Sequence, residues 1–91
     1  MSALDVVFVT EGNCPNCNSI RAVLSKVHHE YRHVEVTEVN PAEPLGRSIV
    51  AEHGVRILPA LIIGGRLRLV GEINARDIQH EIQKAKHHSR H

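Results

Sequence analysis

The chain has 91 residues and a formal net charge of +1, with acidic and basic residues interspersed along it. This length indicates a single domain, which buries roughly 60–65% of its unfolded surface. The balanced charge provides no basic surface of the kind that binds nucleic acid, so no nucleic-acid partner is expected. With one Phe, one Tyr and no Trp, the core must be built from aliphatic side chains.

The sequence has no charged segment followed by an apolar stretch of signal-peptide type, and no apolar run long enough to span a membrane. We therefore expect a cytoplasmic protein without a membrane partner. The two cysteines, Cys14 and Cys17, are three positions apart. In a cytoplasmic protein this spacing favours catalysis or metal binding over a structural disulfide. A disulfide that closes so short a loop constrains the unfolded chain very little.

Residues 4–10 are predicted to form the first strand, because four consecutive apolar residues are typical of a central parallel strand buried on both faces. A helix is predicted at about residues 15–29, where apolar residues recur at spacings of three and four. Pro15 fits the first helical position, since its missing N–H is one that a helix leaves unpaired. Cys14 is then the N-cap, and Cys17 lies one turn in on the buried side. The predicted buried stripe is Cys17, Ile20, Val23, Leu24 and Val27.

Cysteines in these two positions can carry out thiol-disulfide exchange. The positive end of the helix dipole favours the thiolate form of Cys14, which is the form that attacks a disulfide. Side chains three apart on a helix have Cβ atoms about 5–6 Å apart, which is near enough for a disulfide after a small adjustment. We therefore predict that Cys14 is the nucleophile and that Cys17 resolves the mixed disulfide. A structural zinc site needs four ligands, and the sequence has no second C-x-x-C pair.

A second strand is predicted at residues 31–39, where polar and apolar residues alternate. A strand, a helix and another strand in this order predict a parallel pair of strands. The next helix has two alternative starts: Asn40 as a cap, or Pro44, which cannot supply an N–H inside a helix. Gly54 is its expected stop. The residues expected to face inward are Val34, Val36 and Val39 in the strand and Leu45, Ile49 and Val50 in the helix.

Two apolar runs separated by Gly64-Gly65 predict a β-hairpin at about residues 60–70. Leucines and arginines alternate along its return strand, which therefore has the pattern of an edge strand protected by charge. The leucines expected to point inward are Leu67 and Leu69, and the arginines expected to point outward are Arg66 and Arg68.

The last helix has a clear start. Asn74 is the predicted N-cap and Asp77 lies at the third helical position, while Ile73 can pack on Ile78 across the first turn. Ile78, Ile82 and Ala85 are expected to face inward.

After Lys84 the chain is basic and rich in histidine, without an apolar stripe, so we expect the helix to fray there. The predicted domain covers residues 1–86, and residues 87–91 are predicted to be a disordered His-rich tail. These histidines could chelate a metal, but a solvated tail or a remnant of expression is the favoured interpretation.

The predicted order is β-α-β-α-β-β-α, an α/β fold with a mixed four-stranded sheet flanked by helices. Together with three motifs, this layout resembles the thioredoxin/glutaredoxin superfamily over roughly residues 4–85, and most closely its small glutaredoxin-like thioredoxins. The first motif is Cys14-Pro15-Asn16-Cys17 after the first strand. The others are Leu58-Pro59-Ala60, at the place of the family's cis-proline loop, and Val70-Gly71-Glu72-Ile73, before the last helix.

The resemblance implies which residues meet a substrate. In the family the loop proline is cis and packs against the cysteine pair, and Pro59 is predicted to do the same. The preceding residue, Leu58, then offers its backbone groups to an extended substrate. Gly71 would line the groove beside the cysteines, although a turn before the helix cap explains this glycine equally well. Pro15 and Asn16, between the cysteines, complete the predicted substrate-binding set.

Some positions depart from the family's patterns. Thioredoxins usually have a Trp at the position of Asn13. They also have a buried aspartate near the position that Phe8 occupies in this chain, so no general base for Cys17 is evident. Dithiol glutaredoxins usually have a Tyr where this chain has Asn16. Their glycine pair and acidic residues before the last helix, which hold glutathione, are matched only in part by Val70-Gly71-Glu72. Glutathione dependence is therefore the alternative to the main prediction.

We predict a monomeric thiol-disulfide oxidoreductase that reduces protein disulfides through its dithiol pair and needs no cofactor. Its partners would be disulfide-containing client proteins and an electron donor, either a reductase or glutathione. One alternative is a glutathione-dependent glutaredoxin, in which Arg56, Arg66 and Arg68 could bind carboxylates, although solvated positions are favoured for them. The other is a metal- or cluster-binding thiol module. Carrier domains of that kind often have the order β-α-β-β-α-β. The helical pattern of residues 40–53 argues against this order, because it predicts a helix between the second and third strands.

Overall fold

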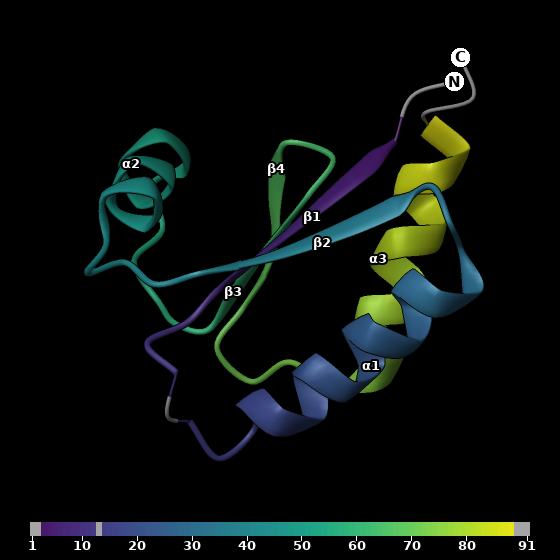
Figure 1. Cartoon of the computed structure of the whole chain (residues 1–91), viewed down its shortest axis with the longest axis horizontal. Helices are drawn as coiled ribbons and strands as arrows, with labels where there is room; N and C mark the ends of the chain where they lie inside the picture. The colour runs from purple at the N-terminus through teal and green to yellow at the C-terminus, as the bar shows by residue number, and fades with distance from the viewer. Residues whose placement is uncertain (1–2, 13, 89–91) are drawn as a thin grey trace.

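The structure is a computed structural model that describes residues 3–12 and 14–88. Within these residues the order of strands and helices is the predicted one (Figure 1). None of the helices in these two ranges has the length and apolar character needed to cross a membrane. In chain order the elements are β1 (Leu4–Val9), α1 (Cys17–Glu30), β2 (Val34–Val39), α2 (Pro44–His53), β3 (Ala60–Ile63), β4 (Arg66–Val70) and α3 (Ala75–His88).

The strands form one mixed sheet in the order β2-β1-β3-β4. β1 is parallel to β2, as expected for two strands joined by a helix, and antiparallel to β3, which is antiparallel to β4. In this register Val6 lies between Val36 of β2 and Ile63 of β3. β1 is therefore a central strand, and its carboxyl end leads directly into the segment that contains the cysteines.

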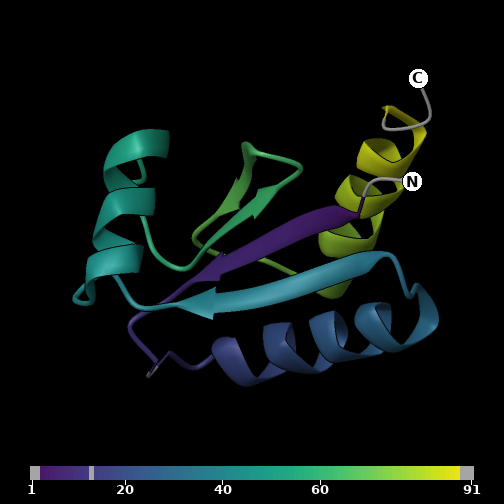
Figure 2. The same cartoon turned by 45° about the horizontal axis from the view of Figure 1, so that its top comes forward.

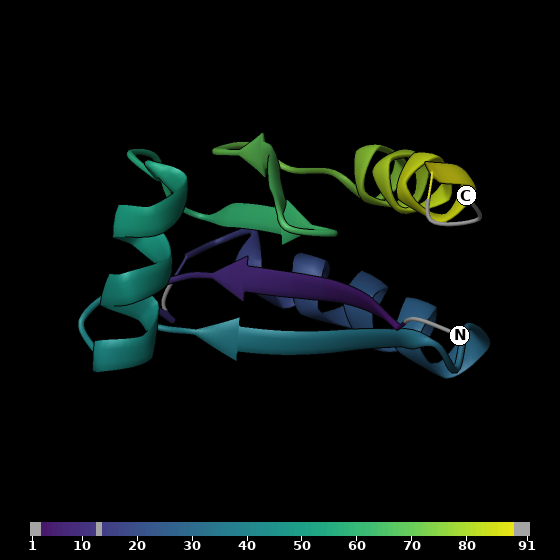
Figure 3. The same cartoon turned by 90° about the horizontal axis from the view of Figure 1, so that it is seen from above.

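Alternate residues of β1 enter two hydrophobic clusters on opposite faces of the sheet. Leu4, Val6 and Phe8 join a cluster with the buried faces of α1 and α3, and Val9 joins a cluster to which α2 contributes. Figure 2 shows α1 lying along β1 and β2, and Figure 3 shows α2 near the carboxyl ends of these two strands, away from α3. The predicted burial of the first strand on both faces is confirmed.

β2 begins three residues later than predicted. Tyr31 is the C-cap of α1, and the Val34 amide donates a hydrogen bond to the Tyr31 carbonyl at 3.0 Å, so residues 31–33 form a turn. Val34 and Val36 contact the first cluster, whereas Val39 is buried in the second. All three valines point inward as predicted, but an odd spacing places Val39 on the opposite face of the sheet.

α2 uses the later of its two predicted starts, with Glu43 as N-cap and Pro44 in the first turn. The Asn40 side chain accepts a hydrogen bond from the Ala42 amide at 2.8 Å, and the Asn40 carbonyl accepts one from the Glu43 amide at 2.9 Å. These two bonds fold the segment before Pro44 into a turn instead of a helix. Gly54 ends the helix in a left-handed conformation, as predicted.

The buried face of α2 differs from the prediction at one position. Leu45 is 60% exposed, and the residue buried in its place is Gly46. A Cβ atom on Gly46 would lie 1.9 Å from the Asn40 carbonyl oxygen, so only glycine lets the helix approach this turn. Ile49 and Val50 pack against the second cluster as predicted.

The hairpin between β3 and β4 is confirmed, but the alternation of its return strand is interrupted. Leu61 pairs with Leu69 and Ile62 pairs with Leu67, so a β-bulge at Arg68 shifts the register by one residue. As a result Leu69 contacts the first cluster and Leu67 the second, although both were expected on one face.

The bulge also changes the surroundings of the arginines in β4. Arg66 is exposed, as predicted. Arg68 was expected to be solvated, and this prediction is wrong: its side chain is 20% exposed and lies 3.5 Å from the carboxylate of Glu81 in α3. The residue that the bulge inserts therefore faces a helix rather than solvent.

α3 starts as predicted, because the Asn74 side chain accepts a hydrogen bond from the Asp77 amide at 2.8 Å. Ile73 and Ile78 are buried together in the first cluster, with Ile82 and Ala85. The helix continues to His88, beyond Lys84, and the fraying expected after Lys84 stays a prediction. The Lys86 ammonium lies 3.5 Å from the centre of the Tyr31 ring, at the end of α1. Residues 89–91 of the predicted tail lie outside the described residues.

Candidate active site

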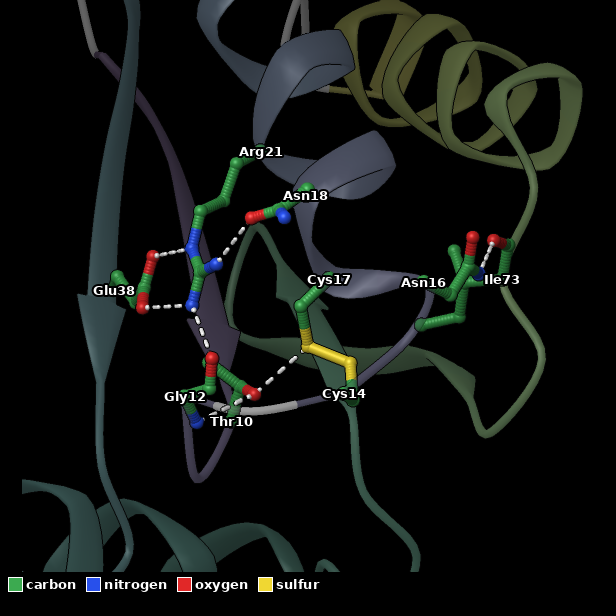
Figure 4. The surroundings of a disulfide bond; sticks show 9 residues. All are labelled: Thr10, Gly12, Cys14, Asn16, Cys17, Asn18, Arg21, Glu38 and Ile73. Carbon is green, nitrogen blue, oxygen red and sulfur yellow. Dashed lines mark hydrogen bonds and ion pairs between the residues drawn. A yellow bond between two sulfur atoms is a disulfide. The ribbon is translucent and has the colours of Figure 1, made fainter.

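The candidate site lies in the segment between β1 and α1 (Figure 4). A disulfide joins Cys14 to Cys17, with 5.2 Å between their Cα atoms. The Cys17 side chain is fully buried in the first hydrophobic cluster, whereas Cys14 is only half-buried at the edge of that cluster. The two sulfurs therefore differ in their access to solvent, and Cys14 is the one that an incoming molecule can reach.

The start of α1 differs from the prediction. The N-cap is Asn16 and the first helical residue is Cys17, so Cys14 is not the N-cap and Pro15 is not the first helical residue. The Cys17 amide donates to the Cys14 carbonyl at 3.1 Å, which closes a tight turn around Pro15 and Asn16. Pro15 suits this turn because its ring fixes φ near the value that the second residue of a turn needs. Cys14 still lies at the N-terminal, positive end of the helix dipole, one turn before the helix begins.

Thr10 provides a polar contact to Cys17 that the sequence analysis did not identify. Its hydroxyl oxygen lies 3.0 Å from the Cys17 sulfur, and the side chain is 3% exposed. The same oxygen accepts a hydrogen bond from the Gly12 amide at 3.1 Å. The position of a Thr directly after the strand, seven residues before Cys17, is a signal that could have identified it, because β1 ends beside the first turn of α1.

Gly12 is held from both sides in a conformation that favours glycine, with φ at +103°. Its amide binds Thr10, and its carbonyl accepts a hydrogen bond from the Arg21 guanidinium at 3.2 Å. Arg21 in turn donates two hydrogen bonds of 2.9 Å to the Glu38 carboxylate of β2 and one of 3.0 Å to Asn18 (Figure 4). The hydrogen bonds to Glu38 raise the pKa of the Arg21 guanidinium above its ordinary value. This network joins β2, α1 and the loop before the cysteines.

The predicted substrate-binding residues from the rest of the chain come to the same end of the sheet. The Leu58–Pro59 peptide bond is cis, which confirms the prediction. Because Val9 pairs with Ala60, Pro59 lies next to the end of β1 from which the cysteine segment departs. The Leu58 side chain packs against the second cluster. The packing of Pro59 on the cysteine pair stays a prediction.

Gly71 and Asn16 connect this loop to the segment before α3. The Gly71 amide donates a hydrogen bond to the Pro59 carbonyl at 2.8 Å, and Gly71 has a φ of +75°. The Asn16 side-chain amide donates a hydrogen bond to the Ile73 carbonyl. Asn16 therefore attaches the turn between the cysteines to the residues that precede α3. The fold thus brings together Pro15, Asn16, Leu58, Pro59 and Gly71 around one end of β1, and their roles toward a substrate stay predictions.

Comparison with known protein families gives a match that covers most of the chain. The family model described as thioredoxin domain matches residues 4–84. This chain belongs to the thioredoxin domain family. A comparison with curated protein sequences finds no match.

Solved structures show the same thioredoxin fold at low sequence identity. Thioredoxin O2 from Arabidopsis thaliana, in its oxidised state, is 22% identical, with 91% of this chain and 75% of that chain covered and a TM-score of 0.74. A mutant thioredoxin from Halobacterium salinarum is 16% identical over 92% of this chain and 75% of its own, with a TM-score of 0.74. A thioredoxin-like protein from Clostridium perfringens is 14% identical, with 92% of this chain and 71% of that chain covered and a TM-score of 0.74.

In this thioredoxin-domain protein, a cysteine pair at disulfide distance follows the first strand, which is the arrangement of a thiol-disulfide oxidoreductase. The position where thioredoxins usually have a buried aspartate is near Phe8, which is buried in the first cluster. The buried polar side chain beside Cys17 is instead that of Thr10.

Proposed function

We propose that this protein reduces disulfides in other proteins by dithiol exchange, with Cys14 as nucleophile and Cys17 as resolving residue. The observation that carries the proposal is the difference between the two linked sulfurs: Cys14 is half-buried, while Cys17 is fully buried. A sulfur that must attack a large substrate needs access, whereas a sulfur that only attacks its neighbour does not.

The reaction proceeds in two exchange steps. The Cys14 thiolate attacks one sulfur of a client disulfide; a bond forms between Cys14 and that sulfur, and the other client sulfur leaves as a thiolate. The Cys17 thiolate then attacks the Cys14 sulfur, the Cys14–Cys17 disulfide forms, and the second client sulfur leaves. Two electrons pass from the cysteine pair to the client, and the client thiolates take up the two protons that the pair releases.

Exposed apolar side chains beside the predicted substrate-binding residues support a protein as the substrate. Ile57 is 55% exposed and Val70 is 39% exposed. A Cβ atom on Gly71 would lie 3.5 Å from Ile57, so Gly71 and Ile57 lie side by side next to the Leu58–Pro59 bond, and Val70 precedes Gly71 at the end of β4. An extended client segment could bury these apolar side chains and pair with the backbone at Leu58.

The proposed setting is a reducing compartment, the cytoplasm, in which a monomer alternates between its dithiol and disulfide forms. Re-reduction needs an electron donor, for which a thioredoxin-reductase-type enzyme and glutathione are the two candidates. In the described residues, no three His, Cys, Asp or Glu side chains gather in a way that could hold a metal ion.

The test is reduction of insulin disulfides by dithiothreitol, followed as turbidity. We expect the wild-type protein to accelerate the reaction, Cys14→Ser to abolish the acceleration, and Cys17→Ser to lose most of it. Coupling the assay in parallel to thioredoxin reductase and to glutathione with glutathione reductase identifies the donor. An inactive wild-type protein that binds one zinc ion or an iron–sulfur cluster through its cysteines would overturn the proposal in favour of a metal-binding module.

A further inference from the structure

The Thr10 hydroxyl is the polar group that touches the buried sulfur of the pair. It lies 3.0 Å from the Cys17 sulfur and is itself almost completely buried. Figure 4 shows it between Gly12 and Cys17, on the side of Cys17 away from Asn16. A buried hydroxyl is normally satisfied by hydrogen bonds, and here the partners are one backbone amide and one sulfur.

The direction of these bonds follows from the chemistry of the partners. The Gly12 amide can only donate, so the Thr10 oxygen accepts that bond. In the disulfide, the Cys17 sulfur carries no hydrogen, so the Thr10 O–H must be the donor in the contact between them. The Gly12 bond occupies one lone pair of the oxygen and leaves its hydrogen directed at the sulfur.

We propose that Thr10 stabilises Cys17 as a thiolate by donating this hydrogen bond, both when Cys17 attacks the mixed disulfide and when it leaves during re-reduction. A thiolate surrounded by apolar side chains is costly, because burial favours the neutral thiol. A hydroxyl that donates to the charged form counteracts this cost, and such charge-assisted bonds are stronger than neutral ones. The proposal rests on the proposed function for the place of each step in the cycle.

In each step the electrons and protons balance. During re-reduction, a donor thiolate attacks Cys14, the Cys14–Cys17 bond breaks, and Cys17 takes the electron pair and leaves as a thiolate. Its proton comes later from solvent or from the donor thiol. During client reduction, Cys17 gives its proton to solvent and its sulfur bonds to Cys14. The bond between Cys14 and the client sulfur breaks, and the client sulfur leaves with the electron pair as a thiolate that takes up a proton from solvent. The Thr10 O–H keeps its own hydrogen throughout and acts by orientation and charge stabilisation, not as a proton carrier.

Charged groups near this face of the sheet are already paired with one another. Arg21 of α1 is held by Glu38 of β2, and Arg68 of β4 lies against Glu81 of α3, which also binds Lys84. Cys14 is the titratable group bonded to Cys17 itself. Replacing the Thr10 hydroxyl leaves these charged groups in place, but it also removes the acceptor of the Gly12 amide. Thr10→Ser keeps both bonds and is therefore the variant with which Thr10→Val is compared.

The test measures the pKa of Cys17 directly. In a Cys14→Ser background Cys17 is the single cysteine, and the ¹³Cβ resonance of labelled cysteine reports its ionisation. Adding Thr10→Val, which keeps the shape but removes the donor, should raise this pKa by about 1–2, the effect of losing a hydrogen bond to a charged group. Thr10→Ser keeps the donor and should leave the value near that of the parent. Thr37→Val, at an exposed threonine of β2, is the matched control and should also have no effect.

A second measurement uses the disulfide form and covers the case in which Thr10→Val alters folding. With the cysteine pair intact, reduction by dithiothreitol should be several-fold slower in Thr10→Val than in Thr10→Ser, because the rate rises as the pKa of the leaving thiol falls. Circular dichroism and thermal melting identify a variant that has lost its structure.

The results separate this inference from the proposed function, because neither measurement uses a client protein. A raised Cys17 pKa in a protein that cannot reduce insulin would support the role of Thr10 and refute the client reaction. An unchanged or lowered Cys17 pKa in a folded Thr10→Val variant would overturn the inference. A lowered pKa in particular would mean that the Cys17 thiol donates to Thr10 in the reduced protein.

Discussion

At the scale of single residues, the chemistry depends on a difference between two identical side chains. Cys14 and Cys17 are covalently linked, yet one is half-buried and the other completely buried. The tight turn closed by the Cys14 carbonyl and the Cys17 amide holds Cys14 outside the helix and places Cys17 on its first buried position. Burial thus assigns the external attack to one sulfur and the internal exchange to the other.

This division predicts that the two serine variants behave differently toward clients. Cys17→Ser should accumulate mixed disulfides with client proteins, because the intermediate has no internal sulfur to release it. Cys14→Ser should accumulate none, since its remaining sulfur is buried. Non-reducing gels and mass spectrometry measure the difference, after the reduced variant is incubated with a lysate whose protein disulfides are intact. Equal capture by both variants would mean that the roles are assigned wrongly.

At the scale of the elements, the loop before the cysteines is held by a network that crosses from β2 to α1. Arg21 binds the Glu38 carboxylate and the Gly12 carbonyl, and Gly12 binds Thr10. The Arg21 and Glu38 side chains are 34% and 42% exposed, so solvent weakens this ion pair. Its main effect should therefore be local, on the position of the loop, rather than on the stability of the whole fold.

Replacing Arg21 with Gln tests this expectation. The free energy of unfolding should fall by less than about 1 kcal/mol, as is usual for an exposed ion pair. Hydrogen exchange of the Gly12 amide should become faster, because the loop loses its anchor on α1. Arg47→Gln is the matched control, since Arg47 is an exposed arginine of α2 that binds the Ala42 carbonyl in the turn before that helix. Unchanged protection of Gly12 would argue against an anchoring role.

Gly46 gives a second prediction at this scale. In an ordinary helix interior, Gly→Ala stabilises by roughly 0.5–1 kcal/mol. In α2 the added Cβ would lie 1.9 Å from a backbone oxygen of Asn40, so the helix would have to move away from its turn. We expect Gly46→Ala to lower the free energy of unfolding by about 1–3 kcal/mol, as overpacking does. Urea denaturation measures the change, with Ser48→Ala on the exposed side of the helix as control. A stabilised variant would show that the turn can shift freely.

At the scale of the whole molecule, three segments that are far apart in the chain meet at one end of the sheet. β1 leads into the cysteine turn, and Ala60 pairs with Val9 at the end of β1. The Gly71 amide donates a hydrogen bond to the Pro59 carbonyl, and the Asn16 side chain donates one to the Ile73 carbonyl. The exposed Ile57 and Val70 side chains border this region. A protein client should therefore contact more of the molecule than a small thiol reductant does.

This difference can be measured with Ile57→Ser. Reduction of insulin should slow several-fold, through a higher KM, because the client loses an apolar contact. Reduction of the protein's own disulfide by dithiothreitol should be unchanged, since the small reductant needs only the Cys14 sulfur. Leu45→Ser is the matched control, because Leu45 is 60% exposed on α2 and belongs to a different part of the surface. An equal loss of activity in both variants would indicate a general effect of surface polarity.

The sequence by itself determined several features that depend on residues within a turn or two of one another, although the start of α1 at Cys17 was not one of them. Asn74 and Gly54 cap their helices as predicted, because a cap is formed by the few residues on either side of it. Gly64-Gly65 produced the hairpin for the same reason. The order of elements and the place of the cysteine pair followed from local periodicity, and that order was enough to reveal the resemblance to thioredoxins.

Only the tertiary structure decided the features that depend on distances between remote segments. The bulge at Arg68 follows from how β4 pairs with β3. Simple alternation predicts that the Arg68 side chain faces solvent, but because of the bulge it lies against Glu81 of α3. Gly46 is buried because α2 lies close to its preceding turn. The Thr10 hydroxyl meets Cys17 because β1 ends beside the start of α1, and no period in the sequence encodes a contact of that kind. Periodicity assigns a residue to a face, whereas packing decides what that face touches.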